Sequence, residues 1–242
     1  MIDWHALLMA ARRANAAYVE GDGPSQAAFV KLGDRWLGQF RNMTNQAVLS
    51  TDPSGQVHLS ISGTRVSQLQ LADVIEDASL EPSVVVGGKV TQGVAYKMAE
   101  LWNWVSLIVP KDKSIVVTGH SLGAARTHLT PLYLSADRVQ QLYSFEAPKF
   151  CNGDFYDTFA DLFKAKMVCV LNGRDSWAAW PWLDPRWQSR PRQDHLWLTN
   201  GTYQLIDPKQ WPGLGKTGDH SMDVVEANIT QLVSNHSPVA IP

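Results

Sequence analysis

Residues 114–125 read SIVVTGHSLGAA, and this stretch decides the fold. Its β-branched beginning is typical of a buried strand, and its small residues at the end are typical of the start of a helix. Between them, Gly-His-Ser-Leu-Gly predicts a sharp turn with Ser121 at its tip. Glycine is needed on both sides of this serine, because strand and helix lie too close in such a turn for larger side chains. The stretch therefore predicts a nucleophile elbow.

The composition indicates one globular domain. The chain has 242 residues, of which 45% are hydrophobic and 18% charged, and its formal net charge is −2. We therefore expect residues 1–242 to form a single domain with a sizeable core. No basic run suggests nucleic acid as a partner. No apolar run reaches the length of about 18 residues that a transmembrane helix needs.

The N-terminal residues do not have the charge order of a secretory signal. Asp3 and His5 come early, and Arg12 and Arg13 follow the apolar residues, whereas a signal peptide begins with positive charge. We therefore expect a cytoplasmic protein, or one released without an N-terminal signal.

Cysteine chemistry is not expected to hold the fold together. The chain has two cysteines, Cys151 and Cys169, which are too few for a disulfide framework. Free buried thiols are favoured, and a single bridge between the two is the alternative.

Helices and strands are predicted in turn along the whole chain. The predicted helices cover residues 3–18 (with Asp3 as N-cap), 66–80, 93–107, a segment from Asp154, and 220–234. The predicted strands are 28–32 paired with 36–40, 47–50 paired with 57–61, 114–118, 139–145, 166–171, and 195–199 paired with 202–206. Together they predict an α/β fold with a mostly parallel central sheet, helices on both faces and antiparallel N-terminal strands.

A serine at an elbow needs a base and an acid, and both candidates follow it along the chain. Catalytic side chains of parallel sheets lie at the carboxyl ends of strands. Asp175 directly follows the predicted strand 166–171, and His220 begins the last helix. The order Ser121, Asp175, His220 is that of α/β-hydrolase enzymes. Imidazole can take the serine proton, and the carboxylate can fix the imidazole tautomer.

Other residues could take these roles. His195 is the alternative base, and Asp184 and Asp194 are the alternative acids. Asp175 could also be only a turn former, and His220 only a helix-cap residue. We expect His120, next to the serine, to point to the other side of the elbow and to be structural.

An oxyanion hole needs two donors that point at the developing charge. The backbone N–H of Leu122, directly after the serine, is one candidate. Thr64 is the other, because it follows the predicted strand 57–61 through Ser62 and Gly63. An ordinary turn after that strand is the alternative.

With these residues assembled, the chain resembles the class 3 (fungal-type) lipase family of the α/β-hydrolase fold. Four blocks carry the resemblance, in order over residues 5–234: Ile61–Thr64, Gly119–Gly123, Asn172–Pro181 and Asp219–Asp223. The resemblance implies that the hydroxy residue of the first block helps to build the oxyanion hole. It also implies that residues 65–86 lie where such lipases have a lid.

Two segments are candidates for contact with an acyl chain. The predicted helix in the lid segment carries Leu71, Val74 and Ile75 on one apolar face, which could cover an acyl groove and open at a lipid surface. A permanently docked surface helix is the alternative. Trp177 and Trp180, in a loop rich in tryptophan, could line an acyl pocket or pack in the core.

The chain departs from the family pattern near the elbow. Glu146–Pro148 stands where the family has Gly-Ala-Pro or Gly-Ser-Pro, so a carboxylate lies at the flank of the predicted site. Arg126 lies in the elbow helix at a position that is usually apolar. We expect Glu146 to pair with Arg126.

The sequence thus predicts a serine carboxylic-ester hydrolase, a triacylglycerol lipase or an esterase, that acts through an acyl-enzyme. The alternatives are a phospholipase or acyltransferase with the same triad, and a catalytically silent lipid-binding fold. No metal or organic cofactor is implied. The expected partner is an ester or lipid substrate at a lipid–water interface, and similar lipases are often secreted. The sequence does not indicate an oligomeric state.

Overall fold

The computed structural model describes residues 2–63, 79–213 and 215–236. An eight-stranded sheet forms its centre, in the order β1-β2-β3-β6-β7-β8-β9-β10. These strands are β1 Arg35–Arg41, β2 Gln46–Thr51, β3 Val57–Ile61, β6 Ile115–His120, β7 Val139–Phe145, β8 Met167–Asn172, β9 His195–Thr199 and β10 Thr202–Ile206. Strands β3, β6, β7, β8 and β9 are parallel, and the flanking strands are antiparallel. The predicted α/β architecture is confirmed.

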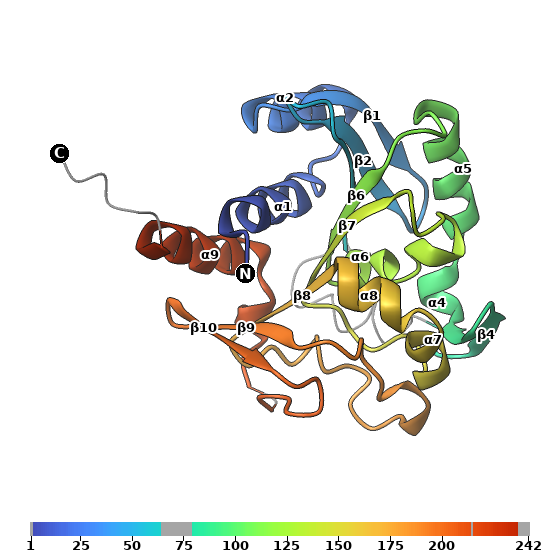
Figure 1. Ribbon diagram of the computed structural model, residues 1–242, viewed down its shortest axis with the longest axis vertical. Helices are drawn as coiled ribbons and strands as arrows, with labels where there is room; N and C mark the ends of the chain where they lie inside the picture. Colours follow the sequence, from blue (N-terminus) through green and yellow to red (C-terminus); the bar gives the residue numbers. More distant parts are fainter. Residues whose placement is uncertain (1, 64–78, 214, 237–242) are drawn as a thin grey trace.

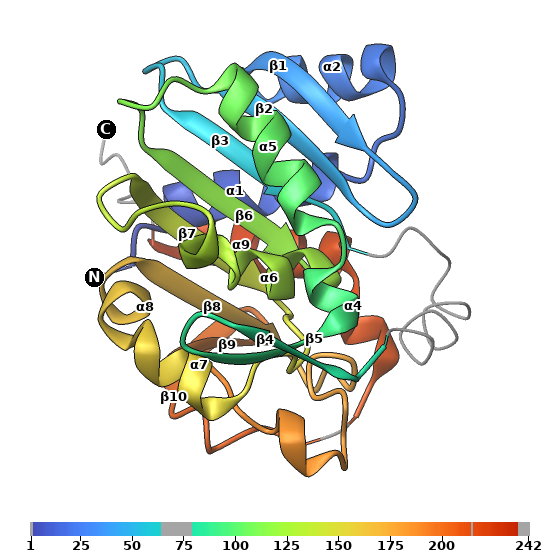
Figure 2. The ribbon, with the colours of Figure 1, turned by 90° about the vertical axis from the view of Figure 1, so that its right-hand side faces the viewer.

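Helices cover both faces of this sheet (Figure 1). On one face, α1 (Trp4–Ala16) lies along α9 (Met222–His236). The other face carries α4 (Gln92–Ala95), α5 (Met98–Ile108), α6 (Leu122–Thr127), α7 (Gly153–Thr158) and α8 (Ala160–Lys166), which Figure 2 shows in front of the strands. A short helix, α2 (Asp22–Lys31), packs beside β1. No helix in the described part of the chain has the length and hydrophobicity that a membrane span requires.

Each face of the sheet has its own hydrophobic core. Neighbouring residues of one strand point to opposite faces, so Cys169 of β8 joins the core under α5 and α7, and Val170 joins the core under α1 and α9. Strands buried on both faces are continuous hydrophobic runs. This explains why β6, whose six residues are all buried, could be predicted from the sequence.

The glycines around the elbow are required by close backbone contacts. A Cβ atom on Gly119 would lie 2.3 Å from the carbonyl oxygen of Gly123, and one on Gly123 would lie 2.2 Å from that of Ile61. Real Cβ atoms do not approach that closely. The predicted strand, turn and helix are confirmed, and the helix packs directly on the end of β3.

One predicted strand was wrong. Residues 28–32 lie mostly in helix α2 rather than in a hairpin with β1, which pairs with β2 instead. Ser25 and Phe29 are the buried residues of α2, and their spacing of four places both on the same helix face. Val30 is 56% exposed, so the apolar run does not mark a strand.

The predicted long helix over residues 93–107 is two helices. It is broken at Lys97, whose backbone is left-handed with φ 55°. The carbonyl of Tyr96, released from helix pairing at this break, accepts a hydrogen bond from Asn45 Nδ2 at 3.2 Å. The break therefore has a partner outside the helix, which a local pattern cannot reveal.

Two further segments differ from the prediction. Asn152, not Asp154, caps α7, and its side chain also accepts from the N–H of Lys89 at 2.9 Å. The loose run after Pro82 is a small hairpin of β4 (Pro82–Val85) and β5 (Gly88–Thr91). The predicted helix over 66–80 falls almost wholly outside the described residues, and so does most of the expected lid, 65–86.

We predict that Gly123→Ala destabilises the protein by about 3 kcal/mol or more, because the added methyl group overlaps the β3 backbone. The free energy of unfolding, measured by urea denaturation, tests this. Gly153→Ala, at the first position of α7, is the matched control, since its Cβ would meet only the ends of the Arg192 and Ser189 side chains, both at 3.4 Å. It should leave stability unchanged or raise it by about 0.5–1 kcal/mol. Equal stabilities of the two variants would contradict the close-contact explanation.

Candidate active site

Ser121 lies at the tip of the turn between β6 and α6, with φ 58° and ψ −127°. Such a backbone conformation is strained for a residue with a side chain and occurs mostly at functional sites. The N–H of Ser121 donates to the carbonyl of Phe145 at the end of β7, at 2.9 Å. The neighbouring strand therefore holds the turn in place.

A continuous hydrogen-bonded chain runs from this serine through His220 to Asp175. Ser121 Oγ lies 2.8 Å from His220 Nε2, and His220 Nδ1 lies 2.7 Å from Asp175 Oδ2. The three residues come from three segments: the end of β6, the 3₁₀-helix Thr217–His220 before α9, and the loop after β8. All three are almost fully buried. The structure thus brings together the three residues that the sequence singled out.

The Asp175 carboxylate is oriented by backbone donors of the loop that follows it. Oδ1 accepts from the N–H of Trp177 at 2.8 Å, and Oδ2 accepts from that of Ala178 at 3.1 Å. Burial alone would raise the pKa of Asp175, but His220, Glu146 and the Trp177 N–H outweigh it and hold that pKa below its ordinary value. Asp175 is therefore ionised, and His220 carries its proton on Nδ1.

The two loops that carry these side chains are joined to each other. Asn172 Nδ2 donates to the carbonyl of Asp219 at 2.8 Å, and the Asp219 carboxylate accepts from the N–H of Arg174 at 2.9 Å. These bonds set the distance between the loop of Asp175 and the loop of His220. Each of these two residues begins a block of the family resemblance, but the sequence did not indicate that they join the two loops.

The prediction that His120 points to the other side of the elbow is wrong, because its ring contacts the backbone of His220. Its Nε2 lies 2.8 Å from the carbonyl oxygen of His220, so Nε2 is the donor and Nδ1 must accept from the hydroxyl of Tyr18, at 2.6 Å. The Tyr18 hydroxyl also lies against Gly63, where an added Cβ would be 2.4 Å from it. Burial lowers the pKa of His120 to about 3, so this ring is neutral. Its hydrogen bond supports the backbone of His220.

Glu146 lies in the same cluster and is fully buried at the end of β7. The predicted pair with Arg126 is wrong. Arg126 donates to the carbonyl of Thr44 at 3.0 Å, whereas Glu146 accepts from the N–H of Asn172 and places Oε2 3.5 Å from His220 Nδ1. Burial lowers the pKa of Arg126 to about 9. Arg126 reaches from α6 to Thr44, whereas Glu146 reaches from the end of β7 to His220, which the sequence could not show.

One group of side chains among the described residues has the spacing of a metal site. Ligand atoms of His120, Glu146 and His220 lie within 4.8 Å of one another. However, His120 Nε2 donates to the His220 carbonyl, and both nitrogens of His220 have partners, Ser121 and Asp175. The cluster is better suited to moving a proton than to holding a cation.

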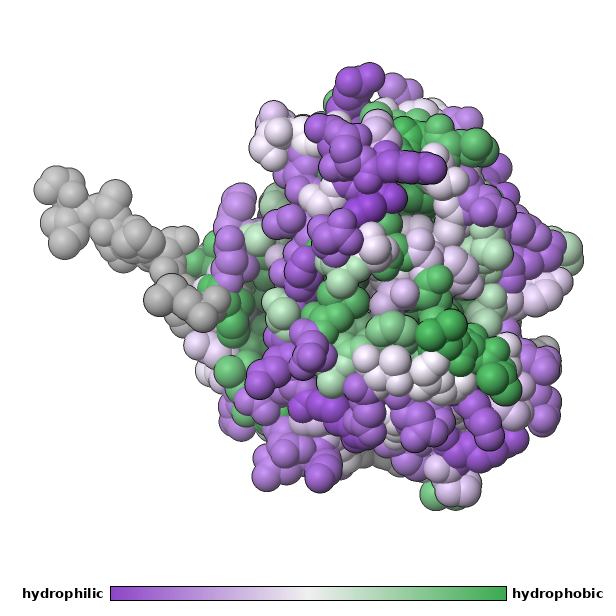
Figure 3. Space-filling model, turned by 45° about the vertical axis from the view of Figure 1, so that its right-hand side comes forward, coloured by the Kyte–Doolittle hydropathy of each residue, from purple (hydrophilic) through white to green (hydrophobic). Residues whose placement is uncertain are grey.

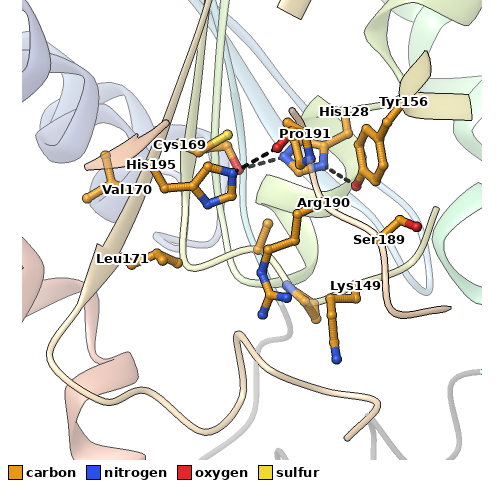
Figure 4. A pocket seen from close by; sticks show the side chains of 13 residues that line it. His128, Lys149, Tyr156, Cys169, Val170, Leu171, Ser189, Arg190, Pro191 and His195 are labelled. Carbon is orange, nitrogen blue, oxygen red and sulfur yellow. Dashed lines mark hydrogen bonds between the residues drawn. The ribbon is translucent and has the colours of Figure 1, made fainter. Parts of the chain in front are cut away.

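The alternative base, His195, lies in a separate small pocket with His128, Tyr156 and Cys169 (Figure 4). Its Nε2 donates to the carbonyl of Pro191 at 3.2 Å, and none of Ser121, Asp175 and His220 lines this pocket. The alternative acids lie away from the serine. Asp184 caps a 3₁₀-helix and pairs with Arg186. Asp194 is exposed to solvent.

The cysteine prediction is confirmed. Cys151 and Cys169 are both free and buried. Burial raises the pKa of each thiol to about 12, so both remain protonated and unreactive near neutral pH.

The tryptophan candidates lie inside the molecule. Trp177 and Trp180 are 6% and 5% exposed and belong to the core under α5 and α7. This burial favours the core-packing alternative. In the same loop, Trp187 Nε1 donates to the carbonyl of Leu80 at 3.0 Å, so the tryptophan loop contacts segment 65–86 at Leu80.

Several predicted site residues fall outside the described residues: Thr64, Leu71, Val74 and Ile75. The chain nevertheless reaches the serine just before Thr64, since a Cβ on Gly63 would lie 2.8 Å from Ser121 Cβ. Leu122 is the first residue of α6, where backbone N–H groups have no partner within the helix.

Comparison with known proteins identifies the family. The model of the class 3 lipase family matches residues 33–183, which include the elbow and Asp175. The chain belongs to the class 3 lipases. It is a carboxylic-ester hydrolase with the α/β-hydrolase fold, as the sequence predicted.

Relatives of this class 3 lipase come from fungi. It is 24% identical to the secreted mono- and diacylglycerol lipase LIP4 of Malassezia restricta, over 88% of this chain and 80% of that protein. It is 27% identical to the secreted mono- and diacylglycerol lipase 3 of Gibberella zeae, over 60% of this chain and 49% of that protein.

Solved structures show the same fold at lower identity. The Rhizomucor miehei lipase superimposes with a TM-score of 0.69 at 17% identity, over 92% of this chain and 79% of the other. A triacylglycerol lipase from Penicillium expansum superimposes with a TM-score of 0.65 at 15% identity, over 89% and 88%.

We predict that His195 makes the lipase lose stability as the pH falls. Burial lowers the pKa of His195 from 6.5 to about 4. Between these values the unfolded chain binds a proton that the folded protein does not, so stability decreases with falling pH. Between about pH 7 and about pH 5, the free energy of unfolding measured in urea should fall by about 2 kcal/mol less for His195→Gln than for the wild type. Parallel stability curves would contradict this.

Proposed function

We propose that this class 3 lipase cleaves acylglycerol esters through an acyl-enzyme on Ser121. The observation that carries the proposal is the unbroken hydrogen-bonded chain from Ser121 through His220 to Asp175, at 2.8 and 2.7 Å. This is the geometry required of a nucleophile, its base and the group that orients the base.

Each group would have a defined task in the reaction. His220 Nε2 takes the proton of Ser121 as Oγ attacks the ester carbonyl, and then donates it to the leaving alcohol. Water attacks the resulting acyl-enzyme in the same way, with His220 again as base and then acid. Asp175 keeps the Nδ1 proton of His220 in place and stabilises the imidazolium that forms.

The oxyanion would be held by two donors that come from different segments. The backbone N–H of Leu122 follows the nucleophile and lies at the positive end of α6. Thr64 is the proposed second donor, supported by the contact distance between Gly63 and Ser121. Removing one such donor commonly costs about 10²–10³ in turnover.

Partial glycerides are the proposed first substrates, because two relatives are named mono- and diacylglycerol lipases. The surface is suited to a lipid aggregate. Hydrophobic side chains gather over the β4–β5 hairpin (Figure 3), where Val84 and Val86 are 81% and 74% exposed. These valines end segment 65–86, so the segment proposed as the lid continues into an apolar surface.

We predict that two of the buried histidines, His220 and His195, differ in their effect on ester hydrolysis. His220→Gln and Ser121→Ala should each lower kcat by about 10⁴ or more, because the first removes the base that takes the serine proton and the second removes the nucleophile. His195→Gln is the matched control and should retain kcat within about threefold, since it lies in a separate pocket. Hydrolysis of p-nitrophenyl butyrate measures all three. A large loss in His195→Gln with an active His220→Gln would overturn the assignment.

A substrate panel tests the ester class. Monoacyl-, diacyl- and triacylglycerols, phosphatidylcholine and p-nitrophenyl esters of increasing chain length would be compared, with Ser121→Ala as the blank. We expect the highest kcat/KM on partial glycerides, with long-chain esters cleaved faster than acetate. Faster cleavage of phosphatidylcholine would indicate a phospholipase, and acyl transfer to added alcohol would indicate an acyltransferase. Activity on acetate alone would indicate an esterase without an acyl groove.

A further inference from the structure

We propose that Glu146 is a positioning residue of the active site: as a neutral carboxylic acid it donates a hydrogen bond to the Asp175 carboxylate and so holds the partner of His220. The inference rests on the proposed triad. It concerns a residue that is glycine in the family pattern and glutamate in this chain.

The backbone at Glu146 is unusual for a residue with a side chain. Its φ is 58°, in the left-handed region that glycine adopts without strain. Its N–H donates to the carbonyl of Val170 in β8 at 2.9 Å, so the conformation is held by the sheet. A residue that keeps its side chain in such a conformation is a candidate for a functional role.

The Glu146 side chain points into the triad. It has no exposed surface, and its first oxygen accepts from the N–H of Asn172. Its second oxygen, Oε2, lies 3.5 Å from His220 Nδ1, which is already bonded to Asp175 at 2.7 Å. Oε2 has no donor of its own. His220 Nδ1 lies 3.5 Å from Glu146 Oε2 and 2.7 Å from Asp175 Oδ2, so both carboxyl groups face the same N–H, and Asp175 is the group to which Oε2 can donate.

Two buried carboxyl groups in contact share one proton, because two adjacent negative charges repel strongly where water is excluded. Asp175 accepts from the N–H groups of Trp177, Ala178 and His220, so it is the better anion. Glu146 accepts from one N–H, that of Asn172. The shared proton is therefore bound to Glu146.

The charged and titratable groups facing Glu146 agree with this placement. Burial, and then the negative charges of Asp175 and Asp219, raise the pKa of Glu146 well above its ordinary value. The other facing groups are two histidines, His220 from the segment before α9 and the neutral His120 from β6. A single negative charge, that of Asp175, thus lies against His220.

The hydrogen bond from Glu146 has two consequences for the reaction. It adds a further donor to Asp175, which fixes the rotation of the carboxylate against His220 Nδ1. It also spreads the charge of Asp175 over a second group, so Asp175 stabilises the imidazolium less than an unshared carboxylate would. Glu146 should therefore extend activity to lower pH.

Two substitutions separate a neutral Glu146 from an ionised one. Glu146→Gln keeps the shape of the side chain, its lack of charge and a donor toward Asp175. We therefore expect kcat/KM to stay within about threefold of wild type, and the acid limb of its pH profile to stay at the same pH. Glu146→Gly removes the donor and suits the left-handed backbone. We expect it to lower kcat/KM about tenfold, with the acid limb moved to higher pH, since a lost hydrogen bond to a charged group commonly costs this much.

An infrared difference spectrum provides a readout that a purely structural role would not change. Wild type minus Glu146→Gln at neutral pH should contain the carbonyl band of a protonated carboxylic acid, and the band should shift in D₂O. Urea unfolding of each variant monitors folding. An absent band, or an acid limb in Glu146→Gln moved down by about one pH unit or more, would show that Glu146 is ionised and overturn the proposal. Full activity and an unmoved limb in Glu146→Gly would also overturn it.

Labelling of Ser121 by a fluorophosphonate keeps this test separate from the proposed function. If the wild-type enzyme hydrolyses the ester and is labelled, but Glu146→Gly has the same activity and pH profile as wild type, the proposed triad is supported and the proposed role of Glu146 is wrong. If Ser121→Ala retains wild-type activity, the proposed triad itself fails.

Discussion

Contacts between the backbones of β3, β6 and α6 set the geometry on which the rest of the structure depends. Gly119 and Gly123 allow α6 to turn back onto β6 and lie against Ile61, and Gly63 allows the chain after β3 to pass beside Ser121. The turn forces Ser121 into a strained conformation that raises its hydroxyl from the sheet edge. Because these contacts join backbone to backbone, they position the serine independently of side-chain motion.

The polar residues around the elbow form a buried cluster that carries little net charge. His120 is neutral because burial lowers its pKa to about 3, and Glu146 retains a proton next to Asp175. Every additional charge would lack water around it and would require a partner. The cluster therefore presents one carboxylate to one imidazole, with neutral groups that support the backbone of His220 and the orientation of Asp175.

Prediction from the sequence succeeded where a pattern is local. The elbow, the hairpin over Asn200 and Gly201, and the positions of Asp175 and His220 follow from strand ends, turns and chain order. It failed where a segment is held by a distant partner. Helix α2, which contains most of residues 28–32, lies beside β1, where Trp36 Nε1 donates to Ser25 Oγ at 3.3 Å, and the helix break at Lys97 is completed by Asn45. Neither partner can be recognised from the segment itself.

The sequence by itself determined the fold class, the family and the order of Ser121, Asp175 and His220 along the chain, because glycines at an elbow and polar residues at strand ends are required locally. Only the tertiary structure decided which side chains surround them. Tyr18 and His120 support the backbone of His220, and Glu146 lies 3.5 Å from His220 Nδ1 rather than paired with Arg126. The physical reason is that hydrogen bonds in a buried cluster join residues about 100 positions apart, and their directions depend on how the strands and helices pack.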